Sequence, residues 1–254
     1  AVSTTHTFDG DATAATGSQS ALTVDMGAMG AIKYQLVDGS LGIGIIDDVL
    51  PTADEETFNG ITGATGLVGV GANGFNYSNT VSAVSINIGY VPAGSASKQT
   101  GTVGAAGAGT GTTSIALSGS PMDGLTVYAG TGNKANATSV EQEDDLMTYA
   151  VKYAYGPVTV GYQVSEIDTY NSATDYDTTG YAIAYAITDD LSVSYAEAKV
   201  DIGGNTVDEE RSGISVGYSM GGMTIKAHNN VTDNVAGAAT NDLEHMEIAV
   251  SFAF

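Results

Sequence analysis

Three histidines, His6, His228 and His245, are the side chains of this sequence best suited to acid–base or metal chemistry. None of them belongs to a Ser–His–Asp arrangement or to an HExxH motif, the patterns of a hydrolytic triad and of a zinc protease. We interpret each as a solvated polar residue, on a loop or near a strand end. The chain has no cysteine, which excludes thiolate nucleophiles, thiolate metal sites and disulfides.

The segment GTGNK, residues 130–134, has some likeness to a phosphate-binding loop. It lacks the Ser or Thr that follows the lysine in such loops, and it lies in a hairpin. We therefore expect neither enzymatic activity nor a bound cofactor.

Acidic side chains gather in the segments DTYNSATDYD (168–177), VEQEDD (140–145) and VDEER (207–211). Carboxylate oxygens suit a hard cation, so Ca²⁺ could bind there, with Asp168, Asp175 and Asp177 as candidate ligands. None of the three segments has the EF-hand pattern. The simpler interpretation is a solvated rim that attracts cations, and calcium binding stays open as the alternative.

The whole chain is strongly acidic, because 29 Asp and Glu residues against 7 Lys and Arg residues give a formal charge of −22. A nucleic-acid partner is excluded in general terms, since one polyanion repels another. The same charge favours a surface that attracts cations, either dissolved ions or a divalent metal.

The second half of the chain alternates apolar and polar residues with a period of two, as β-strands do. Clear examples are MTYAVKYAYG (147–156), GYAIAYAIT (180–188) and HMEIAVSFAF (245–254). Short turns at 155–157, 188–190 and 220–222 separate these strands from long polar connections. Short turns at one end and long loops at the other predict an antiparallel up-and-down sheet, and closing such a sheet into a barrel removes its open edges.

The two faces of these strands differ in a way that favours a membrane over a packed core. One face carries Tyr, Val and Ile, and the other carries mostly Gly, Ala, Ser and Thr with isolated charges. The chain has 14 Tyr but 5 Phe, and tyrosines near strand ends are typical of an aromatic girdle at a lipid interface. The sequence contains no run of 18 or more apolar residues, so it predicts no transmembrane helix. We therefore expect a transmembrane β-barrel, in which Lys226 faces an aqueous lumen while Met223 and Ile225 face lipid.

The final strand, EIAVSFAF, ends in alternating aromatic residues and a terminal Phe254. This ending, the rhythm of the loops and the long segment at 37–79 resemble the general porins of Gram-negative bacteria, in particular the α-proteobacterial type. The resemblance implies a barrel in the outer membrane, in contact with its lipid and lipopolysaccharide, and a homotrimer. It also implies that the barrel-assembly machinery reads Phe254, and that residues 38–72 fold into the barrel as a constriction loop.

The sequence predicts fewer strands than a general porin has. We expect two strands before the long loop, at 21–27 and 31–37, and eleven after it, about thirteen in all. A general porin has sixteen strands with the loop after the fifth. We therefore expect one domain over 1–254 that lacks the first three strands, with residues 1–20 as an extracellular loop. A natural barrel of about fourteen strands is the alternative.

Charged side chains on the small-residue face are the candidate pore residues. General porins place cations on the barrel wall opposite acids on the inner loop, which keeps the water-filled pore polar. Here the resemblance assigns the wall to Lys33, Lys152 and Lys226. It assigns the loop to the acids Asp47, Asp48, Asp54, Glu55 and Glu56. The family usually supplies arginines, whereas this chain has only Arg211, so local pairing of each lysine stays open.

The sequence therefore predicts an outer-membrane channel for passive diffusion of small hydrophilic solutes and ions. The acids favour a mild preference for cations, and residues 21–31 are the expected trimer contact. A protein of a different class remains as the alternative: an acidic, Gly-rich structural or adhesive surface protein that could bind calcium. In that protein the Tyr, Val and Ile face would be a packed core.

Overall fold

The computed structural model of the chain describes residues 1–7, 19–35, 41–47, 49–57, 59–61, 74–92, 111–135, 143–170 and 174–253. These residues form fourteen strands and three short 3-10 helices. None of the helices in these ranges is long and apolar enough to cross a membrane. The expected assembly signal Phe254 and the candidate pore residue Asp48 lie outside the described residues.

The strands are β1 (Val2–Thr7), β2 (Gln19–Asp25), β3 (Ala31–Gln35), β4 (Gly74–Val81), β5 (Val84–Val91), β6 (Thr112–Met122), β7 (Leu125–Ala135), β8 (Glu143–Tyr155), β9 (Val158–Asp168), β10 (Tyr176–Ala186), β11 (Leu191–Ile202), β12 (Glu209–Met220), β13 (Met223–Asp233) and β14 (Leu243–Phe252). The helices are η1 (Gly27–Met29), η2 (Gly42–Ile46) and η4 (Val235–Gly237).

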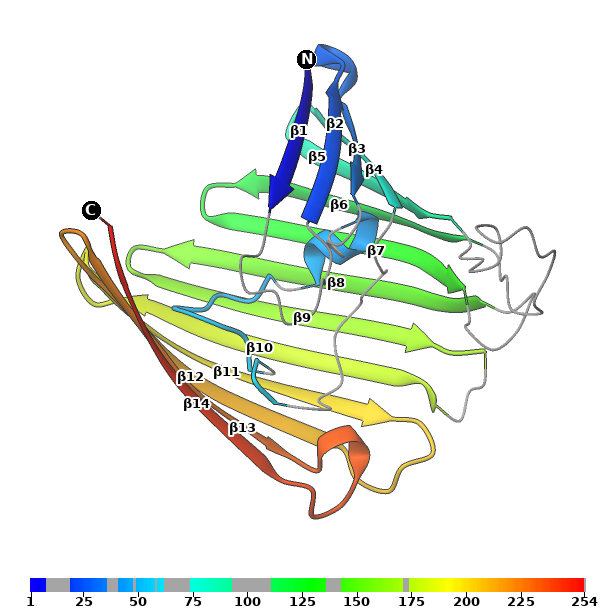
Figure 1. Cartoon of the computed structure of the whole chain (residues 1–254). Helices are drawn as coiled ribbons and strands as arrows, with labels where there is room; N and C mark the ends of the chain where they lie inside the picture. The colour runs from blue at the N-terminus through cyan, green and yellow to red at the C-terminus, as the bar shows by residue number, and fades with distance from the viewer. Residues whose placement is uncertain are drawn as a thin grey trace.

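All fourteen strands belong to one antiparallel sheet, in which each strand pairs with the next along the chain. Figure 1 shows this sheet curling into a deep trough, with β1 and β14 as its two edges. The predicted all-β, antiparallel, up-and-down architecture is confirmed. Within the described residues, β1 and β14 do not pair with each other.

The connections alternate in length as the sequence predicts. Short turns join β4 to β5, β6 to β7, β8 to β9, β10 to β11 and β12 to β13, and they lie together at one end of the trough (Figure 1). The longer connections lie at the other end. Residues paired directly across neighbouring strands point to the same face of the sheet, either into the trough or outward.

The N-terminal part differs from the expectation in one strand. Residues 1–20 were predicted to be an extracellular loop, but Val2–Thr7 pair with Gln19–Val24 as β1 and β2. The sequence does not reveal this strand, because its Ser, Thr and His residues show no apolar alternation. The strand forms through backbone hydrogen bonds to β2, which do not depend on the side chains. Three strands therefore precede the long loop and eleven follow it, where the sequence predicted two and eleven.

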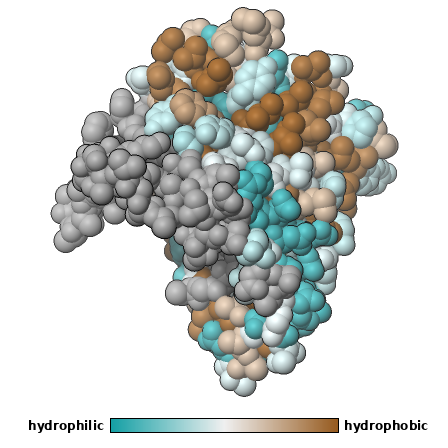
Figure 2. Space-filling model, turned by 90° about the vertical axis from the view of Figure 1, so that its right-hand side faces the viewer, coloured by the Kyte–Doolittle hydropathy of each residue, from teal (hydrophilic) through white to brown (hydrophobic). Residues whose placement is uncertain are grey.

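The outer face of the sheet is apolar and uncovered. In β8, Leu146, Thr148 and Ala150 face the trough and are buried, whereas Tyr149 and Val151 on the other face are 52% and 38% exposed. Figure 2 views the end with the long connections and shows apolar residues grouped above a more hydrophilic region. The structural alternative needs this Tyr, Val and Ile face to be a packed core, and its exposure contradicts that.

Candidate functional site

The described part of the connection between β3 and β4 lies inside the trough, against its concave wall (Figure 1). We call its described residues 41–47, 49–57 and 59–61 the inner loop. The wall beneath it is polar: Gln35, Asn76, Ser114, Thr148, Gln163, Ser194, Ser215 and Asn230 are all buried. The constriction loop over residues 38–72 stays a prediction, because part of that range lies outside the described residues.

The first part of the inner loop is held by apolar packing. Leu41, Ile43 and Ile46, in and beside η2, form a buried cluster with Ala116 of β6 and Leu146 of β8. Burial of each such side chain stabilises this contact by about 1.5–3 kcal/mol. The trough wall thus carries an apolar patch where the first part of the loop covers it.

Glycines on the wall make room for the loop backbone. A Cβ atom at Gly130 would lie 2.7 Å from Ile43 Cγ1, and one at Gly161 would lie 2.4 Å from Pro51 Cδ. A Cβ at Gly217 would lie 2.8 Å from the carbonyl oxygen of Ala53. These wall glycines on β7, β9 and β12 form a track on which the inner loop rests.

Side-chain hydrogen bonds fix the register of the loop on this track. Asn76 Oδ1 accepts from the Gly42 backbone at 2.9 Å, and Gln163 Nε2 donates to the carbonyl oxygens of Ile46 and Asp47 at 2.9 and 3.1 Å. Asn230 Nδ2 donates to the Glu56 carbonyl oxygen at 2.8 Å. The loop contains little regular structure, so wall side chains satisfy its backbone polar groups.

Two wall serines bind the middle of the loop. Ser194 Oγ and Ser215 Oγ lie 2.6 Å apart on β11 and β12. Ser194 accepts from the backbone N–H of Ala53 at 2.9 Å, and Ser215 accepts from that of Asp54 at 3.1 Å. Together they orient the Asp54 carboxylate toward β13.

Asp54 is the acid that the structure joins most closely to the wall. Its Oδ1 lies 3.2 Å from Lys226 Nζ and its Oδ2 lies 2.9 Å from His228 Nδ1. Burial raises the pKa of Asp54, but the hydrogen bonds from His228 and Lys226 outweigh it and leave that pKa below its usual value. Lys226 is on the trough face of β13, as predicted, and it pairs with an acid in direct contact.

Glu55 and Glu56 follow on the same loop and are half-buried. Burial, together with the charges of Glu56 and Asp54, raises the pKa of Glu55 above its usual value. Within the described residues, no lysine or arginine forms a salt bridge with either carboxylate. The negative charge of this pair is therefore not cancelled at contact distance.

The other two wall lysines lie far along the sheet from Lys226. Lys33 is on β3 and shares the trough face with buried Gln35, while Lys152 is on β8 and lies 5.9 Å from the ring centroid of Tyr128. The structure does not bring the three lysines into one cluster. Asp47 is half-buried at the end of η2, near β9.

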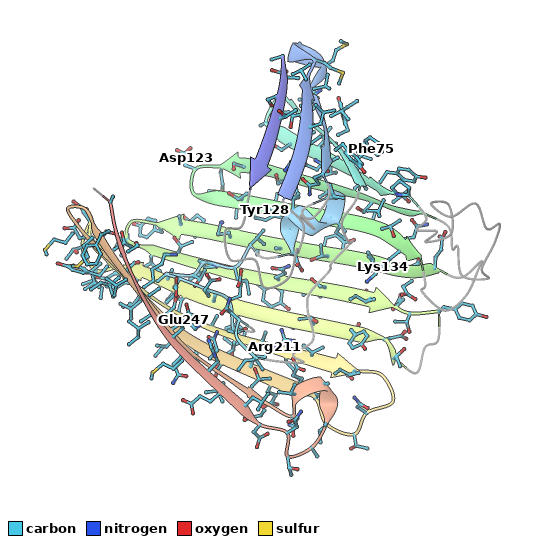
Figure 3. The ribbon with its side chains drawn as sticks, viewed as in Figure 1. Phe75, Asp123, Tyr128, Lys134, Arg211 and Glu247 are labelled. Carbon is cyan, nitrogen blue, oxygen red and sulfur yellow. The ribbon has the colours of Figure 1, made fainter. Side chains whose placement is uncertain are left out.

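Arg211 does not contribute to an open basic wall. Its side chain, labelled in Figure 3, is 1% exposed. It forms a salt bridge with the fully buried Glu209. Glu209 Oε2 also accepts from the backbone N–H of Ala236 in η4. The single arginine therefore holds a connection in place, and the departure from the arginine-rich family pattern is real.

The three acids predicted as calcium ligands do not converge. Asp168 ends β9, Asp177 is on β10, and Asp175 Oδ1 accepts from the Thr169 backbone at 2.8 Å. Among the described residues, the one group of three side chains with ligand atoms within metal-binding reach is elsewhere, on β13 and β14. Calcium binding at these acids stays a prediction.

Beside the inner loop the trough opens into a cavity of about 660 Å³. Its wall comprises loop residues 49–52 and mostly small or polar residues between β6 and β10, together with Leu125 and Lys152. A polar, charged passage narrowed by an inward loop is what a diffusion pore requires.

The comparison with known protein families decides the assignment. The family model described as Gram-negative porin matches residues 2–253. The chain belongs to the Gram-negative porin family. It is accordingly a protein of the bacterial outer membrane, and the recognition made from its last strand and loop rhythm is confirmed.

Solved porins share the fold of this family member. A triple mutant of the Rhodopseudomonas blastica porin aligns with a TM-score of 0.63 and 17% identity, over 100% of this chain and 88% of that one. An anion-selective porin from Comamonas acidovorans aligns with a TM-score of 0.60 and 14% identity, over 93% and 77%. The outer-membrane-expressed OmpT of Vibrio cholerae aligns with a TM-score of 0.58 and 13% identity, over 92% of this chain and 88% of that one. No protein with a curated description matches the chain.

Proposed function

We propose that this porin lets small hydrophilic solutes and ions diffuse passively through its trough-lined pore, with a mild preference for cations. The observation that supports the proposal is on the inner loop, where Glu55 and Glu56 are half-buried and form no salt bridge with a described lysine or arginine. The fold does not determine the sign of the selectivity, since a porin of the same fold is named anion-selective. The charged side chains of this chain must determine it.

The charges near the inner loop favour cations. Asp54 is balanced by Lys226, which lies 3.2 Å away, so this pair adds little net field. Glu55 and Glu56 remain as negative charges beside it, and Lys152 acts at the separate cavity on β8. The chain as a whole adds a charge of −22, which concentrates cations at the mouths of the pore.

Salt should weaken this preference without removing it. Mouth charges are screened over a Debye length of roughly 8–10 Å at physiological salt, whereas half-buried charges are screened much less. Glu55 and Glu56 are half-buried, so the part of the cation preference that they supply should persist in concentrated KCl.

The double replacement Glu55→Gln and Glu56→Gln tests the assignment. In planar bilayers under a KCl gradient, it should move the reversal potential toward the non-selective value. Adding Asp47→Asn and Asp48→Asn should move it further. The matched control is Asp189→Asn with Asp190→Asn, which removes two acids from the exposed turn between β10 and β11. An unchanged reversal potential in the Glu55 and Glu56 variant contradicts the assignment.

We also propose a homotrimer embedded in outer-membrane lipid and lipopolysaccharide, with residues 21–31 at the subunit contact. In support, Leu22, Val24 and Ile32 of β2 and β3 are exposed apolar side chains on the outer face. Light scattering of the detergent-extracted protein should give three times the monomer mass. A particle of monomer mass contradicts the trimer but leaves the channel proposal intact.

A further inference from the structure

Two histidines and a glutamate meet on the trough face of the last hairpin. His228 on β13 is the direct cross-strand partner of Glu247 on β14, and Asn230 is the partner of His245. All of these side chains therefore share one face. One ligand atom each from His228, His245 and Glu247 lie within 4.8 Å of one another, and Figure 3 marks Glu247 on this edge strand.

The imidazole of His228 is buried and has one nitrogen without a partner. Its side chain is 1% exposed, and its Nδ1 is 2.9 Å from Asp54 Oδ2. The other nitrogen, Nε2, is buried and has no hydrogen-bond partner. A buried polar atom without a hydrogen-bond partner is unfavourable, so a nitrogen in this state points to a ligand that it could bind.

Asp54 prepares that nitrogen to act as a ligand. A carboxylate accepts the proton of Nδ1–H, which leaves the lone pair on Nε2. A carboxylate behind a metal-binding histidine is the usual way in which proteins fix its tautomer and ring orientation. Lys226 Nζ lies 3.2 Å from the other oxygen of Asp54, Oδ1, so the lysine and the histidine contact different oxygens of this carboxylate.

His245 completes the arrangement from the neighbouring strand. Its Nε2 is also buried without a hydrogen bond, and it lies 3.6 Å from Glu247 Oε2. The two imidazole centroids are 5.5 Å apart. Ligands of a tetrahedral zinc ion are separated by about 3.3 Å, so His245 and Glu247 are already near this spacing.

The inner loop walls the site on one side and leaves the other side open. A Cβ at Gly60 would lie 2.0 Å from Cδ2 of His245, which shows how closely the loop backbone covers that ring. The Glu247 side chain is 56% exposed and that of His245 is 33% exposed. Both can shift by the small distance that closure around an ion requires.

We propose that His228, His245 and Glu247 form a binding site for a divalent transition-metal ion of the zinc class, with Asp54 as the positioning residue. Two imidazoles and one carboxylate suit Zn²⁺, Cu²⁺ or Ni²⁺ and not Ca²⁺ or Mg²⁺, which prefer oxygen ligands. Three protein ligands leave a position for water. The proposal is independent of the ion selectivity of the channel.

Isothermal titration calorimetry of the detergent-extracted, chelator-treated protein with ZnCl₂ tests the site. The expected result is one Zn²⁺ per chain, with His245→Ala and Glu247→Gln each weakening binding by at least about tenfold. His6→Ala removes the remaining histidine as the matched control and should bind as the parent does. His245 is partly exposed and lies outside the Asp54 contact, so its loss should leave the far-UV circular dichroism unchanged.

A second measurement identifies the ligands independently of affinity. With Cu²⁺, the electron paramagnetic resonance spectrum should show coupling to two imidazole nitrogens in the parent protein and to one in His245→Ala. Zinc binding absent from the parent, or equally tight in His245→Ala, overturns the proposal. A copper spectrum that His245→Ala does not change overturns it as well.

Discussion

Asp54 Oδ2 and His228 Nδ1 are 2.9 Å apart, although 174 residues separate the two positions in the sequence. This hydrogen bond connects the inner loop to the second-last strand and is buried on both sides. The same carboxylate holds Lys226. One acid therefore links the loop to the wall, and removing it should affect both the stability of the protein and the position of the loop.

Replacing Asp54 by Ala should lower the free energy of unfolding by about 1–3 kcal/mol, because the buried imidazole of His228 loses its hydrogen-bond partner. Thermal unfolding of the detergent-extracted protein, followed by far-UV circular dichroism, measures the change. Asp189→Asn, in an exposed turn, is the control and should unfold as the parent does. An unchanged midpoint for Asp54→Ala would show that the linkage contributes nothing to stability.

The glycine track predicts that a single methyl group disturbs the loop. In Gly161→Ala the new Cβ would lie 2.4 Å from Pro51, a rigid ring in the loop, so the loop must move. Overpacking of this kind costs about 1–3 kcal/mol, visible as a lower unfolding midpoint, and the moved loop should alter the single-channel conductance. Gly119→Ala is the matched control, since the closest atom to its Cβ is at 3.2 Å. Equal conductance in the two variants would count against a loop resting on Gly161.

Selectivity should depend on pH through Glu55. Burial and the charges of Glu56 and Asp54 raise its pKa above the ordinary 4.5. A carboxylate loses its charge as the pH falls through its pKa, so the midpoint of the decline that Glu55 causes in the cation preference should lie above pH 4.5, the midpoint for an ordinary glutamate. Reversal potentials measured over a pH series should show this early decline in the parent and not in Glu55→Gln. Superimposable curves would refute the role of Glu55.

Lys152 opposes the acids from the wall of the 660 Å³ cavity. Lys152→Met should therefore move the reversal potential further toward the potassium value. Lys199→Met is the control, because Lys199 is on β11, where its exposed ammonium forms a salt bridge with Asp208. A shift toward chloride in Lys152→Met would contradict the placement of this lysine in the conducting path.

Much of this fold follows from local sequence patterns. The period-two alternation of β8 to β14 and the alternation of short and long connections identify the sheet and its two faces, because side-chain direction in a strand is determined locally. The lumen parity of Lys152 and Lys226 follows from the same rule. Strand β1 could not be predicted because its polar residues do not alternate with apolar ones. It forms a strand because it pairs with β2.

The details of the site depend on contacts that no local pattern records. His228 and His245 were interpreted as solvated residues, yet His228 is buried against Asp54 of the distant loop. The only local signal was the spacing of His245 and Glu247, two residues apart and so on one face of a strand. The sequence left local pairing of each lysine open, and only the path of the loop brings Asp54 to within 3.2 Å of Lys226.

The reversal potential of the unmodified protein in a planar bilayer, under a gradient of KCl, tests the central claim most directly. A passive, cation-preferring pore should give a stable conductance and a modest reversal potential on the potassium side, which decreases as the salt concentration rises. A reversal potential on the chloride side would contradict the assignment of the loop acids. A protein that inserts without any conductance would contradict the channel itself.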